Sequence, residues 1–241
     1  LTPFDVGAYA SSTTYLSGAA VEKAARDARR QILAAAASMI GADADNLDLE
    51  CGGVVGPGGE TVKTLSEVAL HTLYGGDQHQ IIGTASHTSH KSPPPFAAHF
   101  AEVEVDEETG LVDVVRYVAA VDCGTAINPI LAEGQTEGSV VNGIGYALTE
   151  RYLFDDHGRM LNPDLGRYKI PCSADLRELV TILIPTYEPT GPFGAKSVSE
   201  ISINGPLPAI ANAVFDAVGV RLYKAPFTPE RVLDAMRSRV R

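Results

Sequence analysis

Apolar residues recur every three or four positions from about residue 17 to residue 40, which is the spacing of one face of an α-helix. The repeating positions are Val21, Ala24, Ala28, Ile32, Ala35 and Met39. Gly41 follows them as a stop signal. We also expect a short strand at 47–51, a Gly/Pro-rich turn at 52–59 and a second helix at about 64–73.

The middle of the chain changes to the period of two that is typical of β-strands. Strands are predicted at 80–88, 96–106 and 111–122. The short connection at 107–110 predicts that the last two form an antiparallel hairpin. Ser92 to Pro95 should form a stiff, extended link rather than a domain boundary.

Helical and strand patterns alternate irregularly in the rest of the chain. In order, we predict a helix at 130–150, a hairpin turn at 155–158, a strand at 180–184, a Gly/Pro-rich loop at 189–195, a helix at 206–218 and a last helix from Pro229. The predicted class is therefore α+β. Residues 1–241 are expected to form one domain, or alternatively two packed subdomains of about 1–125 and 126–241.

Composition excludes several classes of partner. A formal charge of −11 argues against nucleic acid and against an anionic membrane surface, because both need clustered Lys and Arg. No run of about twenty apolar residues predicts a membrane span. Cys51, Cys123 and Cys172 are too far apart for a disulfide framework or for an iron–sulfur cluster held by this chain.

The N-terminus begins Leu-Thr-Pro-Phe-Asp, without an initiator Met or a basic-then-apolar signal pattern. We therefore expect Leu1 to lie inside a longer gene product, and the protein to be cytoplasmic. His87, His90 and His99 match no standard metal-site spacing, so ordinary surface or hydrogen-bonded histidines are the better interpretation.

Three segments carry residues suited to ligand chemistry. Residues 10–18 combine several hydroxyls with a helix start, which suits a phosphate or another polar ligand, although the spacing alone favours an ordinary Ser/Thr-capped helix. In the helix at 134–145, Gly134, Gly138 and Gly145 fall on one face, which indicates close approach of a ligand or of another backbone.

The third segment is 191–200, where Lys196 and Glu200 follow a flexible loop and precede an apolar helix. A partly buried carboxylate there could act as a general base, although the pattern alone favours a solvated or capping glutamate. The residues alone thus predict a soluble globular domain and leave ligand binding as an open alternative.

At these same places the chain resembles the molybdenum hydroxylases, which include xanthine dehydrogenases, aldehyde oxidoreductases and nicotinate dehydrogenases. The similar segments, in order along the chain, are Thr2–Ser11, Val121–Gly138, Tyr168–Pro171 and Gly194–Glu200. The resemblance covers nearly the whole chain, and these four matches occur in the family's order. The resemblance implies the C-terminal part of a molybdopterin-binding subunit.

The resemblance also implies roles for individual residues. Glu200 would be the catalytic base, and the pterin would contact Ala10, Ser11, Ser12, Thr13, Gln135, Lys196, Ser197 and Ser199. In that family a glutamate takes a proton from the oxygen nucleophile, which attacks an electron-poor carbon. The molybdenum is held through the pterin, with no direct protein ligand expected here.

The implied cofactor is a molybdopterin, expected as its cytosine dinucleotide because the chain looks like a prokaryotic split subunit. The implied partners are the first molybdopterin-binding domain or subunit, an iron–sulfur subunit and a flavin subunit carrying FAD. The substrate would be a small heterocycle such as a purine, with nicotinate or an aldehyde as alternatives. A non-catalytic cofactor-binding or assembly module is the alternative of another class.

The chain departs from the family pattern near the base. Ser199 and Ile201-Ser202 stand where Gly and Pro-Pro often flank the glutamate, and Asn142 stands where many members have Gln. The first glycine-rich pterin loop and the substrate-clamping residues of the family would lie upstream of Leu1. The chain is therefore expected to be catalytically incomplete without partners.

Overall fold

The computed structural model describes residues 4–5 and 7–239. These residues form two compact units, each with its own core: residues 16–90, and residues 91–241 together with the N-terminal segment up to Tyr15. The division differs from the boundary near residue 125 considered above. Strand β5 (Val112–Asp122) and helix α3 (Pro129–Leu148), which lie on opposite sides of that boundary, contribute side chains to the same core.

The unit of residues 16–90 is organised by α1 (Gly18–Ile40), which ends at Gly41 in the left-handed conformation, as predicted. Alanine and leucine side chains of α1 pack against a small antiparallel sheet and α2 (Leu65–Tyr74). The strands of this sheet are β1 (Asp48–Glu50), β2 (Gly53–Val55) and β3 (Thr61–Thr64). Thr64 and Glu67 form a reciprocal capping box at the start of α2.

Two predictions in this unit were wrong. β2 lies inside the segment that was expected to be only a turn. Residues 80–88 form no strand, because their backbone is hydrogen-bonded differently. The side-chain amide of Gln31 accepts from the N–H of Ile82 at 3.3 Å and donates to its carbonyl at 3.0 Å, so one α1 side chain replaces a neighbouring strand there.

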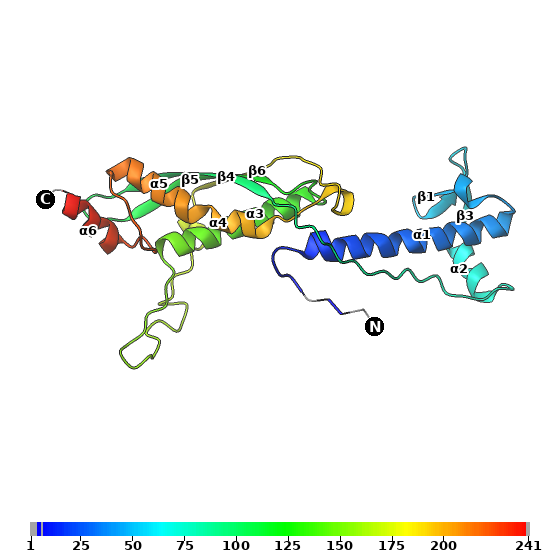
Figure 1. Cartoon of the computed structure of the whole chain (residues 1–241), viewed down its shortest axis with the longest axis horizontal. Helices are drawn as coiled ribbons and strands as arrows, with labels where there is room; N and C mark the ends of the chain where they lie inside the picture. Colours follow the sequence, from blue (N-terminus) through cyan, green and yellow to red (C-terminus); the bar gives the residue numbers. More distant parts are fainter. Residues whose placement is uncertain (1–3, 6, 240–241) are drawn as a thin grey trace. The chain divides into compact units, whose positions relative to one another are not determined.

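The other unit carries the elements labelled β4 to β6 and α3 to α6 in Figure 1. It is built on a three-stranded sheet in the order β4-β5-β6. β4 (Phe96–Val105) and β5 (Val112–Asp122) form the predicted antiparallel hairpin, while β6 (Glu178–Leu183) pairs parallel to β5. Because β5 and β6 run in the same direction, their carboxyl ends lie at the same edge of the sheet. The loops that follow both strands therefore start side by side.

A bulge in β5 explains its unusual pattern of burial. The pairing with β4 shifts between Glu102 and Val103, which leaves one extra residue in β5. Val112 and Val114 face the core before the bulge, whereas the buried set after it begins at Tyr117. The extra residue shifts the alternation by one position, so both halves of the strand keep their apolar side chains on the covered face.

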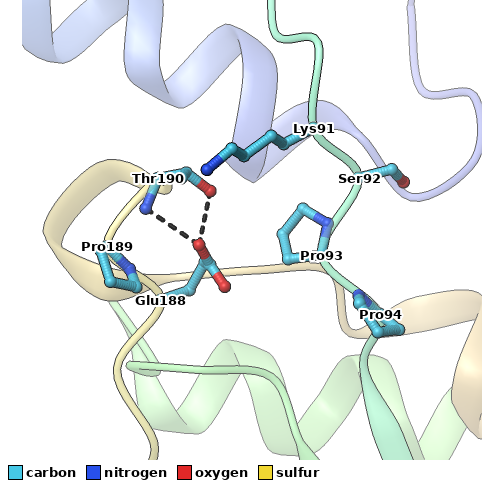
Figure 2. Close-up of a pocket in the computed structure, with 7 residues that line it drawn as sticks. All are labelled: Lys91, Ser92, Pro93, Pro94, Glu188, Pro189 and Thr190. Carbon is cyan, nitrogen blue, oxygen red and sulfur yellow. Dashed lines mark hydrogen bonds between the residues drawn. The ribbon is translucent and has the colours of Figure 1, made fainter.

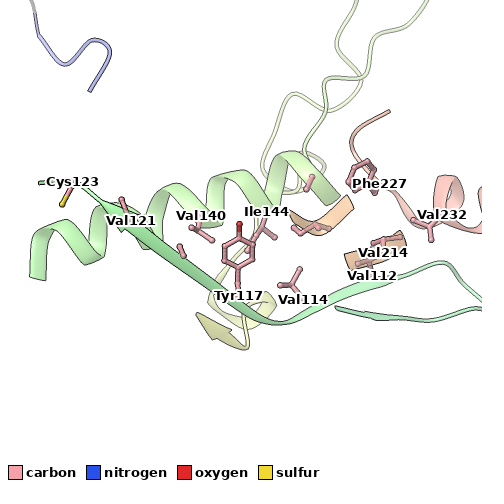
Figure 3. Packing of buried hydrophobic residues seen from close by; sticks show 13 residues of the cluster. Val112, Val114, Tyr117, Val121, Cys123, Val140, Ile144, Val214, Phe227 and Val232 are labelled. Atoms are coloured by element: carbon pink, nitrogen blue, oxygen red, sulfur yellow. The ribbon is translucent and has the colours of Figure 1, made fainter. Parts of the chain in front are cut away.

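Helices cover this face of the sheet. They are α3 (Pro129–Leu148), α4 (Ser199–Asn204), α5 (Pro206–Val218) and α6 (Pro229–Arg239). Figure 3 shows the resulting core, in which residues of β5 meet α3, α5 and the segment around Phe227. Its buried members include Tyr117, Val121, Val140, Ile144, Val214 and Val232.

The predicted helices at 130–150, 206–218 and from 229 are confirmed, as is the strand at 180–184. The turn at 155–158 closes a minimal hairpin through a bridge between Phe154 and Met160. The short helix α4 was not predicted and places Glu200 inside a helix rather than before one. Among the described residues, none of the helices is long and apolar enough to cross a membrane.

Candidate functional site

The loops that follow β5 and β6 are joined by backbone hydrogen bonds. The N–H of Thr125 donates to the carbonyl of Gly194 at 2.8 Å, and the N–H of Lys196 donates to the carbonyl of Cys123 at 2.9 Å. Gly124 has a φ of 73°, and a β-carbon there would lie 2.3 Å from the Gly194 oxygen. Only glycine allows this approach. The segment that leads to Glu200 is thus fixed to the end of β5.

A buried ion pair reinforces this junction. The Lys196 ammonium lies 2.8 Å from the Asp122 carboxylate and 3.1 Å from the Pro94 carbonyl, and its side chain is 9% exposed. The other Asp122 oxygen accepts hydrogen bonds from the Thr186 hydroxyl at 2.6 Å and the Gly124 N–H at 3.0 Å. Lys196, Thr186 and Gly124 thus all donate to the Asp122 carboxylate, and Asp122 was not among the predicted site residues.

Two opposing effects set the pKa of Asp122. Burial alone would raise it, since desolvation disfavours the charged form. The hydrogen bonds from Lys196, Thr186 and the Gly124 backbone outweigh this effect and hold the pKa below its ordinary value. The pair is therefore charged at neutral pH. It holds the ammonium of Lys196, which we had predicted as a cofactor contact, inside the chain.

Glu200 occupies the first turn of α4 and is exposed. Its carboxylate makes no hydrogen bond or ion pair with the described residues. Its backbone N–H, by contrast, donates to the Ser11 hydroxyl at 3.0 Å, and the same hydroxyl lies 2.8 Å from that of Ser199. The base predicted near the end of the chain thus contacts the polar segment at the beginning.

The N-terminal segment has an unusual backbone. Ala10 and Ser11 both have positive φ values, 48° and 53°, which lie in a backbone region that residues other than glycine rarely adopt. The N–H of Ser12 donates to the Tyr9 carbonyl at 2.9 Å. Ser12 is half-buried and Thr13 is exposed, so both predicted contacts lie near Ser11 with part of their surface accessible.

A second hydrogen bond ties this segment to the loop before Glu200. The buried Tyr15 hydroxyl lies 2.7 Å from the Thr190 hydroxyl. Thr190 in turn donates to Glu188 through its N–H at 3.0 Å and through its hydroxyl at 2.5 Å. These hydrogen bonds from Thr190 lower the pKa of Glu188, which keeps its carboxylate charged.

Figure 2 shows a pocket of about 540 Å³ beside this loop, lined by residues 91–94 and 188–190. Three prolines and the stem of Lys91 form much of its wall, and the Glu188 carboxylate is turned toward Thr190. None of the predicted site residues lines it. Sequence patterns could not indicate the pocket, because its two walls are separated by about two fifths of the chain.

The glycines of α3 lie in two different environments, one open and one closely packed. A β-carbon at Gly134 or Gly138 would meet nothing within 4 Å, and Gln135 between them is exposed. Gly145 was predicted on the same face but is buried, because Glu150 and Pro171 pack against it. Within the described chain, the face around Gln135 is thus open for a ligand or another domain.

Gly143, which was not singled out from the sequence, is the position of closest helix packing. A β-carbon there would lie 2.5 Å from Pro206 Cγ and 3.0 Å from the Ile203 carbonyl oxygen. We expect Gly143→Ala to lower the free energy of unfolding by about 1–3 kcal/mol, because the junction of α4 and α5 must move. Gly138→Ala is the matched control and should raise it by up to about 1 kcal/mol. Urea unfolding of both variants measures this contrast, and equal effects would contradict it.

No group of three or more His, Cys, Asp or Glu side chains that could hold a metal ion occurs in the described parts of the chain. His99 is paired with Tyr117, whose hydroxyl lies 2.9 Å from Nδ1, and burial lowers the pKa of this histidine. His87 Nδ1 lies 2.9 Å from Lys23 Nζ. Each of these two histidines thus has a hydrogen-bonded Nδ1, whereas the Nε2 atom of each is buried without a partner among the described residues.

Comparison with known proteins identifies the family. The family model described as the molybdopterin cofactor-binding domain matches residues 1–177. The "Probable hypoxanthine oxidase XdhD" of Escherichia coli K12 is 40% identical over 97% of this chain, which corresponds to 24% of that protein. The chain belongs to the xanthine dehydrogenase-type molybdopterin-binding family. The resemblance noted from the sequence motifs is thereby confirmed.

Other relatives in this family are similar over the same extent. The "Putative xanthine dehydrogenase molybdenum-binding subunit XdhA" of Escherichia coli K12 is 35% identical over 97% of this chain and 32% of that protein. This molybdopterin-binding chain thus spans between a quarter and a third of the length of these two curated relatives.

Solved structures share the fold. CO dehydrogenase from Oligotropha carboxidovorans matches with a TM-score of 0.82 and 27% identity, over 98% of this chain and 30% of that one. Quinoline 2-oxidoreductase from Pseudomonas putida 86 matches with the same TM-score and 28% identity, over 98% of this chain and 31% of that one. The mixed helix-and-strand arrangement predicted from the sequence is therefore confirmed as a fold of this family.

The residues present fit a pterin by their chemistry. A pterin offers ring nitrogens, a carbonyl and phosphate oxygens, which need hydrogen-bond donors. The chain presents partly accessible hydroxyls at Ser12, Thr13 and Ser197, and the exposed amide of Gln135. Beside that amide, the open positions of Gly134 and Gly138 leave room for an approaching group.

Proposed function

We propose that this chain forms part of the molybdenum-binding subunit of a hydroxylase that oxidises an N-heterocycle, such as a purine, with water as the oxygen source. Glu200 is the general base in this proposal. The observation that carries it is the contact of the Glu200 backbone with Ser11, because the two segments that resemble the family's cofactor-contacting and base-bearing motifs meet there.

In this proposal the chain's own residues would bind the pterin and accept a proton. Ala10, Ser12, Thr13 and Gln135 contact the pterin, and Ser197 adds a hydroxyl close to the base. The bound cofactor supplies the electron acceptor and activates the water. Glu200 would take a proton from that water as the water oxygen bonds to the electron-poor carbon, and the hydride that leaves this carbon would pass to the electron acceptor. The Glu200 carboxylate is exposed in the first turn of α4, which is compatible with this role.

The purine class is favoured by the names of the relatives. The two Escherichia coli proteins are described as a probable hypoxanthine oxidase and a putative xanthine dehydrogenase subunit, and quinoline is also an N-heterocycle. Nicotinate or an aldehyde is the second candidate substrate. An aldehyde oxidoreductase subunit of Escherichia coli K12, PaoC, is 38% identical over 58% of this chain.

The proposal also includes partner subunits that assemble with this chain. XdhA is described as a molybdenum-binding subunit, and this chain spans a third of it. We propose that the remaining molybdopterin-binding region, an iron–sulfur subunit and an FAD subunit assemble with this chain, and that the pterin carries a cytosine dinucleotide. Size-exclusion chromatography that showed a stable, active monomer of these 241 residues would contradict it.

Elemental analysis tests the proposed function. The complex that copurifies with this chain should contain molybdenum together with iron. Xanthine, hypoxanthine, nicotinate and an aldehyde would then be compared as substrates in ¹⁸O-labelled water, and the label should appear in the product. A fully assembled complex without either metal would instead indicate a non-catalytic binding or assembly module.

A further inference from the structure

Helix α4 lacks a cap of its own. Its N-cap position is Val198, whose apolar side chain cannot accept a hydrogen bond, and no side-chain cap is formed there. An N-cap side chain normally accepts from the backbone N–H of the second or third helical residue. In α4 the second residue is Glu200, and its N–H is bonded to the Ser11 hydroxyl at 3.0 Å.

The Ser11 hydroxyl therefore accepts the hydrogen bond that a local N-cap side chain accepts in other helices. Ser11 lies 189 residues earlier in the chain than the N–H that it caps. The Ser199 hydroxyl, 2.8 Å away, orients the Ser11 hydroxyl further. Ser199 is one of the departures from the family pattern noted in the sequence, since a glycine there would offer no hydroxyl.

The backbone of the N-terminal segment supports a specific role for this contact. Two successive non-glycine residues, Ala10 and Ser11, hold positive φ values, which costs free energy that an unconstrained segment would release. Tyr15 anchors the other end of the segment on Thr190. The segment is thus held at both ends against the loop and helix that carry Glu200.

We propose that Ser11 is a positioning residue for Glu200: its hydroxyl caps α4 and fixes the base relative to the N-terminal segment. The proposal deepens the proposed function and rests on it for the role of the base. Its structural consequence is that whatever binds along the N-terminal segment is held at a defined position relative to Glu200. The Glu200 carboxylate itself remains available, because the cap uses only its backbone N–H.

Hydrogen exchange of the assembled complex tests this, with fragmentation that resolves the amide of residue 200. Ser11→Ala should accelerate exchange of that amide by about five-fold, the effect of losing one ordinary hydrogen bond. Ser11→Gly removes the same hydroxyl but relaxes the positive φ. Equal acceleration in both variants would assign the effect to the hydroxyl rather than to backbone strain. Ser238→Ala, which loses a hydroxyl contact on the exposed face of α6, is the control.

Kinetics provide a second measurement. Ser11→Ala should lower kcat about ten-fold and flatten its pH dependence, while the KM and the molybdenum content stay within two-fold of the parent, because the base is displaced and the pocket is intact. Unchanged exchange at residue 200 in both Ser11 variants would overturn the proposal. If the complex holds no molybdenum, the proposed function fails, but the exchange measurement still decides whether Ser11 caps α4.

Discussion

Glu200→Gln should lower kcat by about 10²–10⁴-fold, the range that general-base catalysis contributes. The amide has nearly the same shape as the carboxylate but cannot take a proton. The Ser11 cap uses the backbone N–H of residue 200, so α4 should keep its position in the variant. Molybdenum content and the urea midpoint should therefore match those of the parent.

The matched control for this variant is Glu107→Gln. Glu107 is equally exposed but lies in the turn between β4 and β5. Steady-state rates and elemental analysis of both variants give the comparison. If Glu200→Gln retained the parental rate with the cofactor bound, Glu200 would not be the base, and a non-catalytic module would become the better interpretation.

Lys196→Met should lower the free energy of unfolding by about 3–5 kcal/mol, because it leaves the buried Asp122 carboxylate without its cation. Catalysis should fall as well, since the pair fixes the loop that leads to Glu200. The double variant Asp122→Asn/Lys196→Met should lose less stability than the sum of the two single changes. Urea unfolding of all three variants measures the coupling, and strictly additive losses would contradict it.

The pH dependence of this loss has a definite sign. In the parent, the pKa of Asp122 is depressed, so the pair contributes its full stability above about pH 4 and loses it as the pH falls further. In Lys196→Met the lowering by the cation is lost while the opposing effect of burial remains, so the pKa of Asp122 should be higher than in the parent. The difference between variant and parent should therefore be largest near pH 7 and shrink on acidification. The exposed pair Arg116–Glu178 is the control, and Arg116→Met should show little change at any pH.

Most of the fold could be predicted from local patterns, and the exceptions share a physical cause. α1 and the β4–β5 hairpin follow from periodicities of 3.6 and 2 that tertiary contacts reinforce. The expected strand at 80–88 failed because Gln31 satisfies the backbone of Ile82 in place of a strand. α4 was missed because its cap is not local in sequence. Such contacts leave no signal in a window of neighbouring residues.

The candidate site, like the fold, could be predicted from the sequence only in part. Glu200 was indicated by the resemblance to a family, since an isolated glutamate has no distinctive pattern. The partner of Lys196 could not be predicted, because Asp122 meets it only through the parallel pairing of β5 and β6. Spacing could not show that Gly134 and Gly138 are open whereas Gly143 and Gly145 are closely packed. Their surroundings are set by Pro206 and by the turn of the chain at Glu150.

The contact between Ser11 and Glu200 also constrains when the site can form during biosynthesis. A ribosome releases the N-terminal segment first, yet its partner emerges only after 189 further residues have been added. Local contacts such as the β4–β5 hairpin can form during translation, whereas closing a loop of this length must wait. A group that is held by both segments can therefore be inserted only after residue 200 has left the ribosome.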